Sequence, residues 1–101
     1  MLDQLTADSF LPQEGSEFTA DLGDGGVLTL RLMEVVRFPL QPNAPRTEPF
    51  SLLFVGPATP MLLQRINALD HPVIGPLEIF LVALGPVGRD DARMRYEAAF
   101  N

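Results

Sequence analysis

The stretch that predicts most of the fold reads Glu48-Pro49-Phe50-Ser51-Leu52-Leu53-Phe54-Val55-Gly56-Pro57. Its segment 50–55 is almost wholly apolar and has a proline close to each end. Because side chains alternate along a strand, Phe50, Leu52 and Phe54 would share one face and the residues between them the other. A strand that is apolar on both faces is usually covered on both. We therefore expect 50–55 to be a central strand.

Strand patterns recur on both sides of this stretch. The segment 76–84 is again apolar on nearly both faces, whereas 17–22 and 93–100 alternate apolar and polar side chains, as half-exposed strands do. Over 61–70 the periodicity allows helix or strand, and the strand-rich surroundings favour a strand after a helical turn at 61–63. The six expected strands cover 17–22, 27–38, 50–55, 65–70, 76–84 and 93–100.

A short helix is expected at the N-terminus, over 5–11. Thr6 is a suitable N-cap, Asp8 suits the positive end of the helix dipole, and Pro12 ends the helix. Strands joined by short turns, two of them apolar on both faces, close into small barrels or sandwiches. The predicted fold is all-β: a six-stranded antiparallel barrel or two-layer sandwich with a short N-terminal helix, in one domain over 1–101.

Glu34 interrupts the alternation of the long strand 27–38, because strict alternation would turn it inward. Either a β-bulge near Met33 shifts the register, or Glu34 is a buried acid with a partner. The bulge is favoured because bulges are frequent in strongly curved sheets.

The composition excludes several classes of function. The 101 residues carry a net charge of −6, and all seven basic residues are scattered arginines, which argues against nucleic acid and anionic membranes as partners. The absence of cysteine excludes thiolate chemistry and disulfides. No signal-peptide pattern or apolar window of about 18 residues is present, so a cytoplasmic location is the default expectation.

Candidate catalytic and metal-binding residues are few. The single histidine, His71, precedes a proline in a turn and has no acidic or cysteine cluster at ligand spacing. The adjacent acids Asp90 and Asp91 lack calcium-loop spacing. A Ser/His/Asp triad can be drawn from Ser9, Ser16 or Ser51 with His71, as in any chain with one histidine. We expect no enzyme activity, no metal and no cofactor.

The doubly apolar strands carry more outward apolar side chains than a chain of this size readily covers. Two explanations remain open: a protein interface, by self-association or with a partner, or cover by the N-terminal helix. The candidate interface residues are Leu53, Val55, Phe80, Val82 and Leu84.

The connection 39–47 is rich in proline, which prevents regular strand pairing and favours an exposed loop. It is longer than a usual hairpin loop. It is therefore a candidate functional loop through Pro42, Pro45 and Arg46, although a tolerated insertion explains it as well.

Six groups of residues carry a resemblance to a known family: 5–7 with Phe10; Gly15 with Phe18; 49–54 with 56–57; 69–72 with Gly75; 77–82 with 85–86; and 95–101. With these motifs the chain resembles a family of small bacterial domains of unknown function, about 100 residues long. The resemblance covers nearly the whole chain and implies a shared fold, with no catalytic residues. It also implies a loose association with genes for phage-tail-collar-like fibres. Asn67 stands where the family pattern has an aromatic residue.

The preferred hypothesis is a non-enzymatic protein-binding or assembly module, for a phage-tail-like or surface-fibre structure. The alternative is a carrier that holds a small ligand inside the barrel. Against the carrier, a barrel of six strands should be filled by its own Phe and Leu side chains.

Overall fold

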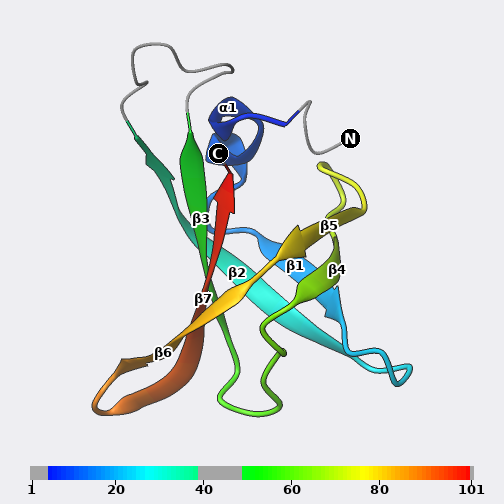
Figure 1. Ribbon diagram of the computed structural model, residues 1–101, viewed down its shortest axis with the longest axis vertical. Coiled ribbons are helices and arrows are strands. Elements are labelled where there is room, and N and C mark those ends of the chain that lie inside the picture. Colours follow the sequence, from blue (N-terminus) through cyan, green and yellow to red (C-terminus); the bar gives the residue numbers. More distant parts are fainter. Residues whose placement is uncertain (1–4, 39–48, 101) are drawn as a thin grey trace.

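The computed structural model describes residues 5–38 and 49–100. They form the helix α1 (Ala7–Phe10), the 3-10 helix η2 (Leu11–Gln13) and seven strands, one more than expected. The strands are β1 (Glu17–Asp21), β2 (Val27–Arg37), β3 (Phe50–Gly56), β4 (Ile66–Asp70), β5 (Leu77–Phe80), β6 (Val82–Gly88) and β7 (Asp91–Phe100). All seven belong to one antiparallel sheet in the order β5-β4-β1-β2-β3-β7-β6, which curls into a half-barrel (Figure 1). Of the two predicted architectures, the barrel is the nearer one.

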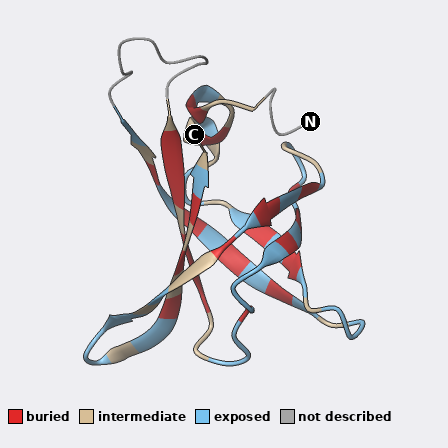
Figure 2. Cartoon of the chain, in the orientation of Figure 1, coloured by how far each residue is buried: buried red, intermediate tan, exposed pale blue. Residues whose placement is uncertain are grey.

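β3 is the central strand that its sequence predicts. It pairs with β2 over Phe50 to Val55 and with β7 along its whole length. Leu52 and Phe54 are fully buried on the concave side, where the Phe54 ring packs edge-on against Phe18 at 5.3 Å between centroids. Figure 2 shows β3 as buried over most of its length, in contrast to the alternating burial of β1 and β2.

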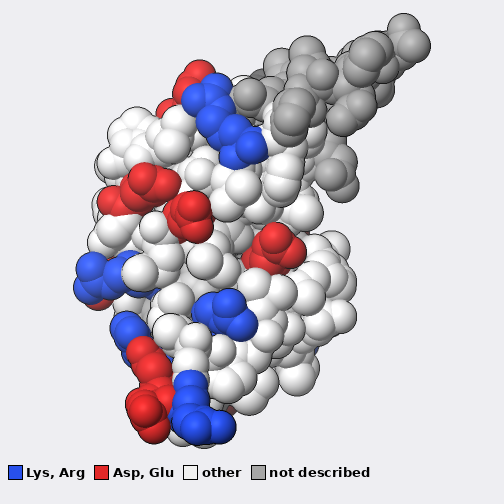
Figure 3. Space-filling model, turned by 90° about the vertical axis from the view of Figure 1, so that its left-hand side faces the viewer, with Lys and Arg blue, Asp and Glu red and all other residues white. Residues whose placement is uncertain are grey.

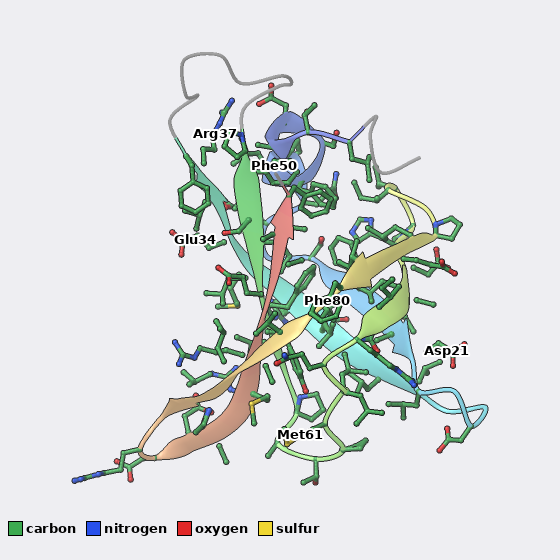
Figure 4. The ribbon with its side chains drawn as sticks, viewed as in Figure 1. Asp21, Glu34, Arg37, Phe50, Met61 and Phe80 are labelled. Atoms are coloured by element: carbon green, nitrogen blue, oxygen red, sulfur yellow. The ribbon has the colours of Figure 1, made fainter. Side chains whose placement is uncertain are left out.

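The irregularity at Glu34 is a bulge. The β2–β3 register shifts between Leu32 and Glu34, and Glu34 is exposed, pointing away from the sheet (Figure 4). The N–H of Val35, just beyond the shift, donates to Glu14 Oε2 at 2.7 Å. The bulge therefore keeps the acid in water, and the alternative of a buried acid is wrong.

The expected strand 76–84 divides into two strands at Leu81, which explains the incorrect strand count. β5 pairs with β4 at one end of the sheet order, and β6 pairs with β7 at the other. Leu81 is fully buried, and its N–H donates to the carbonyl oxygen of Arg65 at 3.1 Å. One continuous piece of chain thus crosses the open side of the half-barrel, as the diagonal ribbon of Figure 1 shows.

The segment between the expected strands 76–84 and 93–100 is mostly strand. β6 continues through Gly85 and Pro86 to Gly88, which pairs with Asp91, so only residues 89–90 lie between β6 and β7. Proline is compatible with pairing here because β6 uses one edge only. Gly85, with φ of 104°, lies at a register shift.

The N-terminal helix closes one end of the core. The Phe10 ring is fully buried and lies 5.9 Å from Phe50 and 5.8 Å from Phe100. At the helix start, the N–H of Thr6 donates to Ser9 Oγ at 3.1 Å. The helical turn expected at 61–63 is absent from the described residues, where Leu62 is instead buried, with its N–H donating to Tyr96 Oη at 2.9 Å.

Candidate functional site

The candidate interface residues of β3 lie on its convex face and are largely covered. Val55 is buried, and Leu53 is half-buried. In the register, Val55 lies between Arg31 of β2 and Arg95 of β7. Long charged side chains cover apolar neighbours with their aliphatic parts while the charge stays in water. This flanking accounts for the low exposure of Val55, so the convex face of β3 offers little apolar surface.

The other three candidates lie on the strand that crosses the open side. Phe80, in β5, is 51% exposed, and Leu84, in β6, is 41% exposed, whereas Val82 is half-buried. Val82 pairs with Glu97, which also pairs with Leu53, so these three side chains form one row on the convex face. Phe80 lies apart from this row, at the end of β5 (Figure 4). The five candidates therefore do not form one patch.

The candidate loop residues Pro42, Pro45 and Arg46 lie outside the described residues.

A groove of about 190 Å³ lies between β5 and the end of β7, next to Phe80. Its walls are mostly apolar, and the charged residue among them is Glu78. The lining residues are Ile66, Glu78, Ile79, Phe80, Ala98, Ala99 and Phe100. In the described part of the chain, the groove is the place where β5, at one end of the sheet order, faces the residues of β7 that lie beyond its pairing with β6.

Ile66 is the residue of this region that the sequence did not indicate. It is 63% exposed and pairs with Phe80 across β4 and β5, so the two side chains lie on the same face. The alternation of β4 turns Asn67 inward instead, where its Nδ2 donates to the carbonyl oxygens of Leu63 (3.1 Å) and Arg65 (2.9 Å). Its Oδ1 is buried without a partner in the described structure. A polar residue inside and an apolar one outside reverse the usual pattern.

His71 forms a hydrogen bond with Ser16, one of the serines considered for a triad. His71 is 4% exposed, and its Nδ1 accepts from the N–H groups of Val73 (3.0 Å) and Ile74 (3.2 Å). The proton is therefore on Nε2, which donates to Ser16 Oγ at 2.9 Å, while the Ser16 hydroxyl donates to the Gln13 carbonyl. A catalytic Ser–His pair needs the opposite arrangement, with the imidazole accepting the serine proton. This geometry is that of a histidine holding a turn.

Burial sets the protonation of His71. Desolvation lowers its pKa below the usual 6.5, and the neighbouring Asp70 carboxylate offsets part of this change. The Phe18 ring lies 4.3 Å from the imidazole, centroid to centroid. The neutral ring therefore packs as part of the core.

A second hollow, of about 480 Å³, lies over β1 and β4 and includes two carboxylates. Each is engaged locally: Asp21 Oδ1 accepts from the N–H of Gly23 at 2.7 Å, and Asp70 Oδ1 from the N–H of His71 at 2.9 Å. Within 5–38 and 49–100, no group of three or more His, Asp or Glu side chains is placed to hold a metal ion.

Asp91 pairs with Arg93 at 2.7 Å, which lowers the pKa of Asp91.

Acidic and basic side chains are interspersed on the face seen in Figure 3, so that face presents no field of a single sign. Among the described residues, no helix has the length and apolar character needed to cross a membrane.

The family described as "Domain of unknown function (DUF6916)" matches over residues 5–100. The chain belongs to this family. Neither curated proteins nor solved structures give a match.

Proposed function

We propose that this DUF6916 domain is a non-enzymatic module that binds protein. The observation that carries the proposal is the exposed pair Ile66 and Phe80, 63% and 51% exposed, beside the apolar groove. Two large apolar side chains held in water next to a concave apolar surface are typical of a protein interface. The geometry of His71, which turns its proton toward Ser16, supports the non-enzymatic part of the proposal.

We extend the proposal to assembly of a phage-tail-like or surface-fibre structure. The support is the resemblance of the sequence motifs to small bacterial domains associated with such genes. The alternative of a small-ligand carrier is less favoured. The largest fully buried side chains are Tyr96, Phe10, Phe18, Phe54, Leu30, Leu32, Leu52 and Leu81, and they fill the interior.

Co-purification tests the proposal. The full chain is produced together with the products of its neighbouring genes, and an unrelated acidic β-protein of similar size serves as the control bait. We expect one neighbour to co-purify in a fixed ratio with this chain and not with the control. Light scattering after size exclusion measures self-association in parallel. A monomer that retains none of the neighbouring gene products would contradict the proposal.

A further inference from the structure

We infer that the groove between β5 and β7 binds an extended segment of the partner as an added strand, with a basic side chain next to Glu78. The inference rests on the proposed function and specifies its surface and the chemistry of its partner.

The groove exists because one piece of chain leaves its partner strand. β6 pairs with β7 as far as Val82 and Glu97. A straight continuation would bring Leu81 opposite Ala98, but the chain turns at Leu81 and pairs with β4 instead. β5 and β7 therefore diverge from a common apex, as their ribbons show in Figure 1.

Both walls of the groove are open strand edges. In the described parts of the chain, Ala98 to Phe100 pair with β3 alone, and β5 pairs with β4 alone. Successive residues of a strand direct their N–H and C=O groups to alternate sides, so each of these strands presents part of its backbone groups to the groove. An extended peptide backbone supplies the matching row of acceptors and donors.

The lining specifies the side chains of the bound segment. Ile66 and Phe80, the exposed pair in the lining, suit apolar residues at alternate positions of an added strand. Glu78 is exposed and is the charged residue in the lining, within a chain of net charge −6. Charge complementarity therefore favours a Lys or Arg of the partner at this point.

The same charge disfavours a second copy as the occupant. Two copies joined edge to edge by a two-fold axis through this groove would bring their Glu78 carboxylates to one interface. Two chains of net charge −6 also repel each other. A basic segment of another protein brings no second Glu78 carboxylate to the groove and is attracted to the acidic chain.

The test uses random heptapeptides displayed on filamentous phage and selected against the full chain. We expect the enriched peptides to combine alternate apolar residues with at least one Lys or Arg. With the synthesised, fluorescein-labelled peptides, fluorescence anisotropy should show binding weakened about tenfold or more by Glu78→Arg. The matched control Glu34→Arg, which reverses an exposed acid on β2, should leave the affinity within about twofold. Hydrogen exchange should show new protection at 77–80 and 98–100.

Three results would overturn the inference: no enrichment above background, affinity unchanged by Glu78→Arg, or protection confined to other strands. The proposed function is judged separately. If a neighbouring gene product co-purifies equally with the wild-type chain and with the Glu78→Arg and Phe80→Asp variants, the groove is not the site, and protein binding stands. If the peptides bind the groove and no neighbour co-purifies, the groove is a peptide site, and the assembly role fails.

Discussion

Two segments of this chain have nearly the same pattern and different outcomes. β3 and the segment forming β5 and β6 are both apolar on two faces. β3 lies between β2 and β7 and is buried along most of its length. The other segment is divided between the two ends of the sheet order, where Phe80 and Leu84 are exposed.

The difference follows from the number of neighbouring strands. A strand with two neighbours has both edges satisfied, and the side chains of those neighbours flank its convex face. Among residues 5–38 and 49–100, β5 and β6 each have one neighbouring strand, which leaves one edge and part of one face open within this described part. A doubly apolar pattern thus indicates that burial of both faces of a strand would be favourable. It does not indicate whether both faces are covered, because the covering residues belong to other parts of the sequence.

The largest expected effect separates the two segments directly. Phe54→Ala should lower the free energy of unfolding by about 3–5 kcal/mol, since it leaves a cavity beside Phe18 in the core. Phe80→Ala should change it by no more than about 0.5 kcal/mol, because half of that side chain is already in water. Urea unfolding followed by circular dichroism measures both. Equal losses would show that β5 is as well covered as β3.

A smaller effect distinguishes the two segments by their glycines. A Cβ at Gly56, the last residue of β3, would lie 2.7 Å from Leu30 Cδ2, whereas at Gly85 of β6 the space is open and φ is 104°. Alanine at either position should cost about 1–3 kcal/mol, by overpacking at Gly56 and by backbone strain at Gly85.

Asparagine separates these two causes, because it is larger than alanine and tolerates positive φ better. Gly56→Asn should therefore cost more than Gly56→Ala, and Gly85→Asn less than Gly85→Ala. Thermal unfolding of the four variants gives the comparison. If asparagine costs more than alanine at both positions, or less than alanine at both, then one cause acts at both glycines, contrary to the structures of the two strands.

The sequence predicted the elements whose pattern is local. The central strand, the N-terminal helix and the bulge at Glu34 are all confirmed, because alternation, capping and a misplaced acid each leave a mark on a few neighbouring residues. The bend at Leu81 leaves no such mark. It results from competition between β4, which precedes this piece of chain, and β7, which follows it, and the apolar pattern does not mark where one pairing gives way to the other.

The candidate site was predicted only in part for the same reason. Phe80 was identified from its apolar excess and is exposed, whereas Val55, chosen on the same ground, is buried between two arginines of other strands. Ile66 was missed because its strand turns Asn67 inward. That choice depends on the carbonyl groups that the Asn67 amide reaches, which a pattern of apolar residues does not contain.

The smallest expected effect concerns the turn at His71, which joins β4 to β5. It is measured by changing the pH. Because burial lowers the pKa of His71 in the folded chain, the unfolded chain takes up a proton more readily. The contribution of His71 to stability is therefore complete above pH 6.5, its ordinary pKa, and is lost as the pH falls from 6.5 toward the lower pKa of the folded state.

Urea unfolding between pH 7.5 and pH 5, above the range in which ordinary carboxylates titrate, should show the free energy of unfolding fall with decreasing pH. His71→Asn should remove this dependence, because its amide oxygen can accept the Val73 N–H without titrating near neutrality. Ser16→Ala, which removes only the hydroxyl partner of Nε2, should retain it. If the pH dependence persists in His71→Asn, another group causes it. The neutral imidazole of His71 would then not be what holds β5 beside β4.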